Sequence, residues 1–320
     1  MRSRLGIALA GAALLLAHIA CAETYPTRPI TLIQGFDTGG NADTVARILA
    51  ASLAEGLGQP VIVEPRPGAA GTIASARAAK ATPDGYTLIL LTSGHAVTAS
   101  TYKSLPFDPV DDYAMVSMAT AFPMLISVRA DSPMKTLADL IAAAKAKPGT
   151  ITFSSVGVGS TQHLTGELFS SLTGIKLLHV PYKGGTAPVS DLLGGQIDVM
   201  VDTITVTQPQ VAAGRIRALG VSSVDPWPTL PDVPPITRTV PGFEVRAWTG
   251  LAGPKGVPQP VVERLNQEMR RSLASPAVKA RIEQMGSRVI PTSPAEMHDF
   301  VAAEVRKWHK VAAAAQIEPR

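Results

Sequence analysis

Cysteine is almost absent from this sequence, since Cys21 is the only one among 320 residues. Aromatic residues account for 5% and charged residues for 17% of the chain. A lone cysteine excludes a disulfide within the chain. The absence of a lysine and arginine run, together with the low aromatic content, argues against nucleic acid as a partner. Apolar residues make up 46%, which is enough to fill the cores of about two domains of ~100–200 residues each.

Residues 1–22 have the features of a secretory signal peptide. Two arginines precede the apolar run LGIALAGAALLLAHIA, and the small residues ACA end it. We predict cleavage after Ala22, which removes Cys21, and a mature protein in the Gram-negative periplasm. A transmembrane anchor is disfavoured because the run is shorter than the ~20 residues of a span and contains His18. A lipid anchor on Cys21 is the less favoured alternative.

Short apolar runs alternate with helical patterns after the signal. We expect strands in PITLIQG, PVIVE and GYTLILLT, with helices over 42–57 and 72–80. A second series follows FPMLISVRADSP, with helices over 136–147, 160–173 and around 191–193 and strands in TITFSS, KLLHVPY, IDVMVD and IRALGVSS. The tract VDPWPTLPDVPPITRTVPGF cannot be helical because proline blocks helix propagation. The chain then ends with a returning strand in WTGLAGPKGVP and two or more helices over 258–316. Such alternation predicts an α/β fold with mostly parallel sheets flanked by helices.

Two similar units begin the two halves of the chain. ITLIQGFDTGGNADTVARILAASL and ITFSSVGVGSTQHLTGELFSSL both run from a strand through a glycine-rich polar loop into an amphipathic helix. A helix N-terminus leaves several N–H groups without partners and carries partial positive charge, so it can receive an anion. We therefore predict that the two loops form an anion-binding clamp across a cleft. Helix capping alone is the structural alternative for the first loop.

Known catalytic and cofactor motifs do not fit this chain. Gly157 and Gly159 supply two glycines of GxGxxG, but Gln162 occupies the third position, and neither GxxxxGK[ST] nor GxSxG is present. His163 and Glu167 lie four apart on a predicted helix, but no third metal ligand can be identified, so a packed histidine beside the pocket is favoured. We expect no cofactor, no metal and no catalytic residue.

A third strand-to-helix turn carries Tyr182 and Lys183, in HVPYKGG. Tyrosine offers a flat apolar face with a polar tip, and Lys183 either pairs with a ligand carboxylate or is solvated. Asp202 ends the run IDVMVD and either caps the next helix or faces the pocket.

The sequence resembles the Bug-type extracytoplasmic solute receptors of tripartite tricarboxylate transporters. The matching segments are FDTGGNADTVAR, VEPRPGAAG, PDGYTLI, LPFDP, GSTQHLTGELF, HVPYKGG, DLLGGQ, IRALGVSS, LPDVPP, WTGLAGPKGVP and RKW. They occur in the family's order from about Tyr25 to Gln316, which covers nearly the whole mature chain.

This resemblance implies a type II periplasmic binding fold, with two lobes joined by two crossover strands. Domain 1 would comprise 23–123 and 247–320, and domain 2 would comprise 124–246. It further implies a monomer that holds a small carboxylated solute and delivers it to integral membrane transporter subunits. The expected ligand-binding residues are Phe36, Asp37, Thr38, Gly39, Gly40, Asp43, Thr92, Ser93, Ser155, Gly159, Ser160, Thr161, His163, Tyr182, Lys183 and Asp202.

Two departures from the family pattern concern the ligand. Asp37 and Thr38 replace a Pro-Ala pair, which adds a negative charge beside the expected carboxylate site. TSGHAVTAS lacks the family's Asn-Pro, so the wall formed by Thr92, Ser93 and His95 is expected to be atypical. A sensor reporting the same solute to a membrane kinase, and a periplasmic enzyme, are the alternative functions.

Overall fold

The computed structural model describes residues 25–314, 317 and 319. The predicted signal peptide, with Cys21 and the cleavage site after Ala22, lies outside these residues. Within the described part of the chain, no helix is both long enough and apolar enough to cross a membrane.

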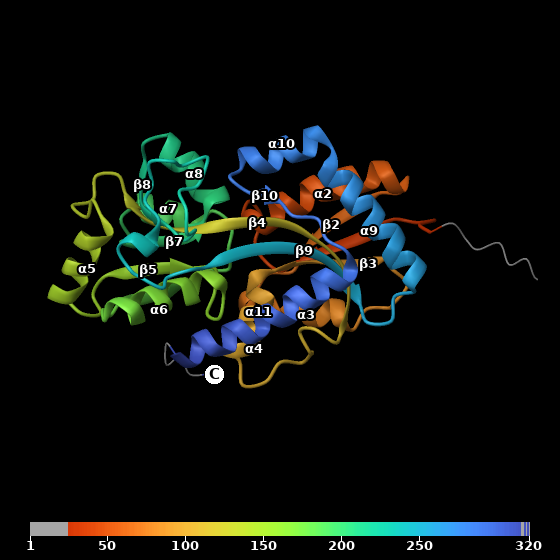
Figure 1. The fold of residues 1–320 in the computed structure, drawn as a ribbon, viewed down its shortest axis with the longest axis horizontal. Coiled ribbons are helices and arrows are strands. Elements are labelled where there is room, and N and C mark those ends of the chain that lie inside the picture. Colours follow the sequence, from red (N-terminus) through yellow and green to blue (C-terminus); the bar gives the residue numbers. More distant parts are fainter. Residues whose placement is uncertain (1–24, 315–316, 318, 320) are drawn as a thin grey trace, which may run out of the picture.

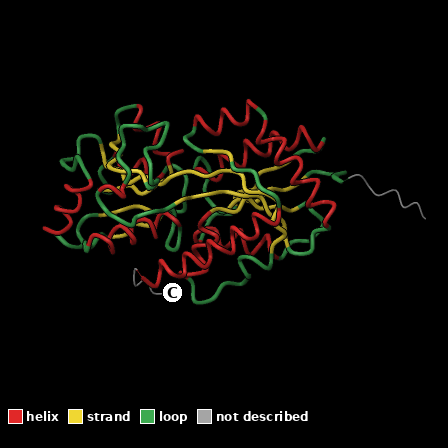
Figure 2. Tube along the Cα trace, in the orientation of Figure 1, coloured by secondary structure: helices red, strands yellow, loops and turns green. Residues whose placement is uncertain are grey.

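The described chain forms two lobes, each with a sheet at its centre and helices outside it (Figures 1 and 2). The first lobe begins with β1 (Ile30–Gln34), α2 (Asn41–Leu57), β2 (Val61–Pro65), the 3₁₀ turn η1 (Ala69–Gly71), α3 (Thr72–Ala79), β3 (Thr87–Thr92) and α4 (Ser93–Thr101). The second contains α5 (Leu137–Ala146), β5 (Thr152–Ser155), α6 (Thr161–Thr173), β6 (Leu178–Pro181), α7 (Ala187–Leu193), β7 (Val199–Thr203), α8 (Ile204–Ala212), β8 (Ile216–Val221) and the 3₁₀ turn η2 (Ile236–Arg238). The chain then returns to complete the first lobe with α9 (Gln259–Ala274), α10 (Pro276–Gln284), β10 (Arg288–Val289) and α11 (Pro294–Ala314).

Two long strands, β4 (Tyr113–Arg129) and β9 (Arg246–Pro254), connect the lobes, as Figure 1 shows. The strand order is β2-β1-β3-β9-β4 through the first lobe and β4-β7-β5-β6 through the second, with β8 and β10 also paired to β4. β4 pairs with β9 over Tyr113–Pro123 and with β7 from Met124 onward. The predicted mixed α/β fold with two crossover strands is therefore confirmed.

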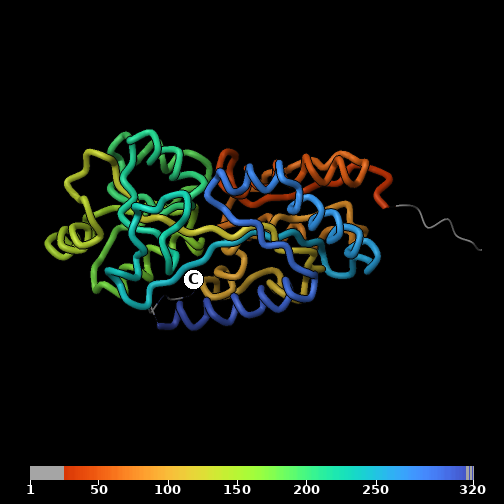
Figure 3. Tube along the Cα trace, turned by 45° about the horizontal axis from the view of Figure 1, so that its top comes forward, coloured from red at the N-terminus to blue at the C-terminus, as the bar shows by residue number. Residues whose placement is uncertain are grey.

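Periodic apolar residues explain why the predicted helices form. In α2, the buried residues Val45, Ile48, Leu49 and Leu53 recur every three to four positions and face the sheet. The helix ends at Gly58, whose φ of 69° is the left-handed conformation that glycine adopts readily. In Figure 3, the C-terminal helices lie against the N-terminal part of the first lobe, so segments distant in sequence share one core.

Several elements differ from the sequence-based expectations. The helices α4 and α8 were not predicted, and β4 begins nine residues before the run FPMLISVRADSP. The proline-rich tract contains one 3₁₀ turn, η2, which needs only i→i+3 hydrogen bonds. The ends of the other predicted helices differ from the observed ends by no more than about two residues. The exception is α7, which begins earlier than expected, at Ala187.

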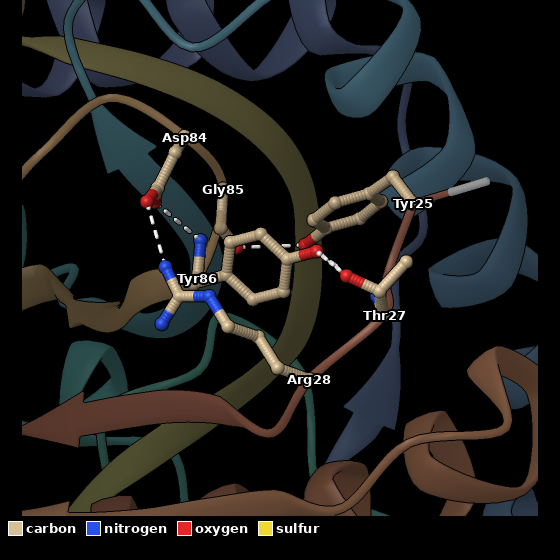
Figure 4. Close-up of polar contacts among 6 residues, drawn as sticks. All are labelled: Tyr25, Thr27, Arg28, Asp84, Gly85 and Tyr86. Atoms are coloured by element: carbon tan, nitrogen blue, oxygen red, sulfur yellow. Dashed lines mark hydrogen bonds and ion pairs between the residues drawn. The ribbon is translucent and has the colours of Figure 1, made fainter. Parts of the chain in front are cut away.

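The first described residues are fixed to the loop that precedes β3 (Figure 4). The Tyr25 hydroxyl donates a hydrogen bond of 2.7 Å to the carbonyl of Gly85. Arg28 pairs with Asp84 at 2.8 Å, and its guanidinium lies 3.9 Å from the ring centroid of Tyr86. The chain is therefore packed on the first lobe within a few residues of the predicted cleavage site.

Candidate functional site

A small cavity of about 50 Å³ lies where the two lobes meet. The ends of β1 and β3 and the middle of β4 contribute to it from the first lobe, and the ends of β5, β6 and β7 contribute from the second. The lining residues are Phe36, Gly40, Asn41, Ala42, Thr92, Ser93, Gly94, Phe122, Met124, Val156, Thr161, Gln162, Gly184, Gly185, Asp202, Thr203 and Val206. One part of this lining is apolar and the other consists of backbone and short polar groups, which suits a small molecule with a polar end.

Four helix N-termini meet at this cavity. First-turn or capping residues of α2, α4, α6 and α8 belong to its lining. No side chain caps the N-terminus of α2, α4 or α8 among the described residues, so the first N–H groups of these helices remain available. Unpaired N–H groups and partial positive charge at one point favour an anion there. Since neither Lys, Arg nor His lines the cavity in the described chain, these dipoles and hydrogen bonds supply the attraction.

Asp202 is the ionisable residue of the cavity wall, at the end of β7. Asp202 is 3% exposed. Its Oδ1 accepts hydrogen bonds from the Thr203 amide at 2.7 Å and from Gln162 Nε2 at 3.3 Å. Burial raises the pKa of Asp202 to about 6, although hydrogen bonding from the amide and side chain of Thr203 and from Gln162 opposes this shift.

Hydrogen bonds between the lobes surround the cavity. Ser93 Oγ at the start of α4 lies 2.8 Å from Thr161 Oγ1 at the start of α6, and both residues are buried. Asn41 Nδ2 donates to Thr205 Oγ1 at 2.7 Å. The Asp37 amide donates to the Lys183 carbonyl at 3.2 Å. The structure is therefore a closed form, in which both lobes contact each other around the cavity.

The loop between β1 and α2 uses several of its polar groups internally. The Gly39 amide donates to Asp43 Oδ2 at 3.1 Å, and Arg47 Nε pairs with the same oxygen at 3.0 Å. Asp43 is buried and holds the loop, whereas Thr38 and Gly39 are exposed and Asp37 is half-buried outside the lining. Gly40 lines the cavity.

The loop between β5 and α6 also makes its own contacts. Ser155 Oγ lies 2.6 Å from His179 Nε2, and the Ser160 hydroxyl accepts the His163 amide as the cap of α6. The Gly159 amide donates to His163 Nδ1 at 3.2 Å. These residues are not part of the cavity lining, and Thr161 is the member of the predicted set that reaches the lining from this loop.

The histidines of this region are packed against other rings. His163 stacks on His179 with ring centroids 4.1 Å apart and lies 3.6 Å from Glu167. No cluster of three metal-ligating side chains occurs within the residues that the structure describes. His95 is buried, and its ring nitrogens lie 3.0 Å from Ser75 Oγ and 2.8 Å from the Pro109 carbonyl. Burial lowers the pKa of His95 to about 4, so its ring is neutral at pH 7.

The third predicted turn lies at the edge of the site. The Tyr182 hydroxyl donates to Asp191 Oδ2 at 2.6 Å. Burial is the larger cause and this hydrogen bond the smaller cause that together raise the pKa of Tyr182 to about 12. The Lys183 side chain is exposed, and Gly184 and Gly185, which follow it, line the cavity.

Apart from Phe36, which lines the cavity as expected, sequence reasoning did not select the apolar part of the lining. Phe122 and Met124 lie on the crossing strand β4 and Val206 lies on α8, and an apolar residue in a strand or helix gives no sign that it faces a cavity. Gly184 and Gly185 had a usable signal, because the pair stands in HVPYKGG beside the predicted Tyr182 and Lys183.

Two lobes, two crossing strands and a cavity lined by helix N-termini define the class of periplasmic solute-binding receptors. The sequence profile of the tripartite tricarboxylate transporter family receptor matches residues 45–317. The chain belongs to this family.

Known relatives agree with this assignment. A protein of Pseudomonas sp. strain P51, described as the UPF0065 protein in the tcbD-tcbE intergenic region, is 38% identical over 291 residues, covering 90% of this chain and 87% of the relative. The structure of the periplasmic binding protein BugD has a TM-score of 0.89 at 36% identity, covering 92% of this chain and 100% of BugD. The R. palustris protein Rpa4515, solved with adipate, has the same TM-score, identity and coverage.

Proposed function

We propose that this protein is a periplasmic receptor that binds a small carboxylated solute between its lobes and delivers it to a tripartite tricarboxylate-type membrane transporter. The observation that carries the proposal is the convergence of four helix N-termini on a cavity without a cation. The carboxylate of such a ligand would accept hydrogen bonds from the free N–H groups, and the apolar part of the ligand would pack against Phe122 and Met124. The adipate bound to Rpa4515 supports the same chemistry.

We further infer that the mature chain acts as a monomer without catalysing a reaction. Domain 1 would comprise 23–123 and 247–320, and domain 2 would comprise 124–246, moving about β4 and β9. The change of partner in β4 between Pro123 and Met124 supports the first of these boundaries. Secretion with cleavage after Ala22 completes the proposal.

A carboxylated ligand is expected to raise the thermal stability of the protein and to compact it. At about 100 times its dissociation constant, a ligand that binds only the folded state adds ~2.7 kcal/mol to the free energy of unfolding. Melting scans and small-angle scattering test this with monocarboxylates, dicarboxylates, aromatic acids and amino acids, and with neutral amides of the same acids as matched controls. If the acids give no more stabilisation than the amides, the proposed function is wrong.

The Ser93–Thr161 hydrogen bond is expected to stabilise the liganded, closed form. Replacing either residue, by Ser93→Ala or Thr161→Val, removes a buried contact between the lobes worth about 1 kcal/mol, which lowers affinity roughly fivefold. In a double-mutant cycle measured by titration calorimetry, the second substitution should then cost much less than the first. Ser100→Ala is the control, because Ser100 Oγ donates to the Val97 carbonyl within α4 and to no other described residue. Fully additive losses would show that the two hydroxyls do not cooperate in closure.

A further inference from the structure

Asp202 is anomalous in a cavity that favours anions. Its Oδ1 already receives two hydrogen bonds, whereas Oδ2 receives none from the described residues. The residue is 3% exposed, so water compensates little for an unpaired charge. A buried carboxylate with one free oxygen therefore shares the cavity with the proposed ligand carboxylate.

The described elements that pack around Asp202 supply no cation to balance it. β7 packs against β4, β5, α6, α7 and α8, of which β5 and α8 have no titratable side chain. The titratable groups on the others are Tyr113 and Arg129 on β4, His163 and Glu167 on α6 and Asp191 on α7. Across the cleft, α2 contributes Asp43 and Arg47, which pair with each other.

Each of these groups has a partner other than Asp202. Arg129 pairs with Asp131 at the far end of β4, and His163 lies 3.6 Å from Glu167. The Tyr182 hydroxyl donates to Asp191, and the Tyr113 hydroxyl donates to the Ser75 carbonyl. None of them lines the cavity.

A proton resolves the conflict between the two carboxylates. Like charges that share a desolvated site cannot both remain ionised. Protonation of Asp202 turns its free oxygen into an O–H donor, and a hydrogen bond from a neutral acid to a carboxylate is among the stronger types. Burial raises the pKa of Asp202 to about 6 before any ligand adds its charge, so the proton is readily taken up near neutral pH.

We propose that Asp202 determines specificity by binding the solute as a neutral carboxylic acid, which donates a hydrogen bond from its carboxyl group to a ligand carboxylate. This inference rests on the proposed function. When the ligand binds above the pKa of the free receptor, one proton moves from solvent to Asp202, and the ligand carboxylate stays ionised. A ligand ammonium group in the same place would instead keep Asp202 ionised.

Linkage fixes the sign of the pH dependence. Below about pH 5, Asp202 is already protonated in the free receptor, so affinity does not change with its titration. Above about pH 6, binding requires proton uptake, and affinity falls about tenfold per pH unit until the pKa of the liganded state is reached.

Titration calorimetry of the mature chain tests this with amino-free acids, namely adipate, malate, succinate and benzoate. Measurements at pH 7.5 in buffers of different ionisation enthalpy give the number of protons taken up, and we expect close to one for the acid that binds most tightly. Asp202→Asn keeps a donor of the same shape without titrating. It should abolish the uptake and make affinity independent of pH between about 6.5 and 8, where the acids themselves are fully ionised.

The matched control is Asp198→Asn, because Asp198 is exposed immediately before the first residue of β7 and accepts the Thr152 amide. It should retain the wild-type uptake and pH profile. Binding without proton uptake, or tight binding confined to amino acids, overturns the inference and leaves the receptor function intact. If no acid of any class binds, the proposed function fails and this inference fails with it. Should Asp202→Asn not fold, the proton count of the wild type decides alone.

Discussion

Gly40→Val is expected to lower the affinity for a carboxylated ligand at least about tenfold, or ~1.4 kcal/mol. Gly40 lines the cavity at the start of α2, and a Cβ placed on it would lie 3.4 Å from the amide nitrogen of Gly185 in the opposite lobe. The branched atoms of valine would extend further into this gap. The substitution therefore obstructs both the approach of the ligand to the helix N-terminus and the closure of the lobes.

Backbone strain does not explain the expected loss. Gly40 has φ −83° and ψ −179°, an extended conformation that valine adopts without cost. The fold should therefore survive, and the melting temperature of the unliganded protein should change little. Titration calorimetry measures the affinity, and small-angle scattering with saturating ligand should find the variant more open than the wild type.

Ala51→Val is the matched control for this experiment, because residue 51 is exposed on the same helix. It also ends in a valine, adding two methyl groups at a distance from the cleft, and should leave affinity within about twofold, since exposed substitutions have small effects. An unchanged affinity in Gly40→Val would mean that the ligand does not approach α2 and that closure does not need this contact.

The helices that sequence reasoning found and missed differ in how they are buried. α2 has one apolar face and one polar face, and this periodicity is readable from the sequence. Nearly all of α4 is buried, so SGHAVTAST shows no polar face that would mark it as a helix. α8 contains Pro209 and several β-branched residues, and packing against β4, β7 and β8 overrides their low helix propensity.

The site was predictable at the level of loops but less so at the level of atoms. A helix after a glycine-rich loop gives the position of free N–H groups, and Gly40 and Thr161 were selected for that reason and line the cavity. Ser93 also lines it, but it was selected as part of the wall after the third strand, without the helix that it begins. Which hydroxyl or carboxylate turns inward depends on partners far away in sequence. Ser155 lies beside His179, 24 positions further on, and no local pattern reveals such a contact.

Trp308→Ala is expected to lower the free energy of unfolding by about 3–5 kcal/mol, because it removes a large side chain from a closed core. Trp308 is fully buried in α11, which packs against α4 and β4, and its Nε1 donates to Glu304 Oε2 at 3.2 Å. Urea denaturation followed by circular dichroism measures the loss. Lys310→Ala in the same helix is exposed and should change the value by less than about 0.5 kcal/mol.

Trp308→Phe separates the packing of the ring from its hydrogen bond. Phenylalanine keeps much of the apolar volume but removes the N–H donor, so Glu304 retains Lys307 at 3.3 Å as its partner. We expect a loss clearly smaller than for alanine, since the cavity term dominates. Equal losses for both variants would assign the stabilisation to the hydrogen bond instead. A loss below about 1 kcal/mol for alanine would show that α11 is dispensable for the core beneath α4, whose N-terminus forms part of the cavity wall.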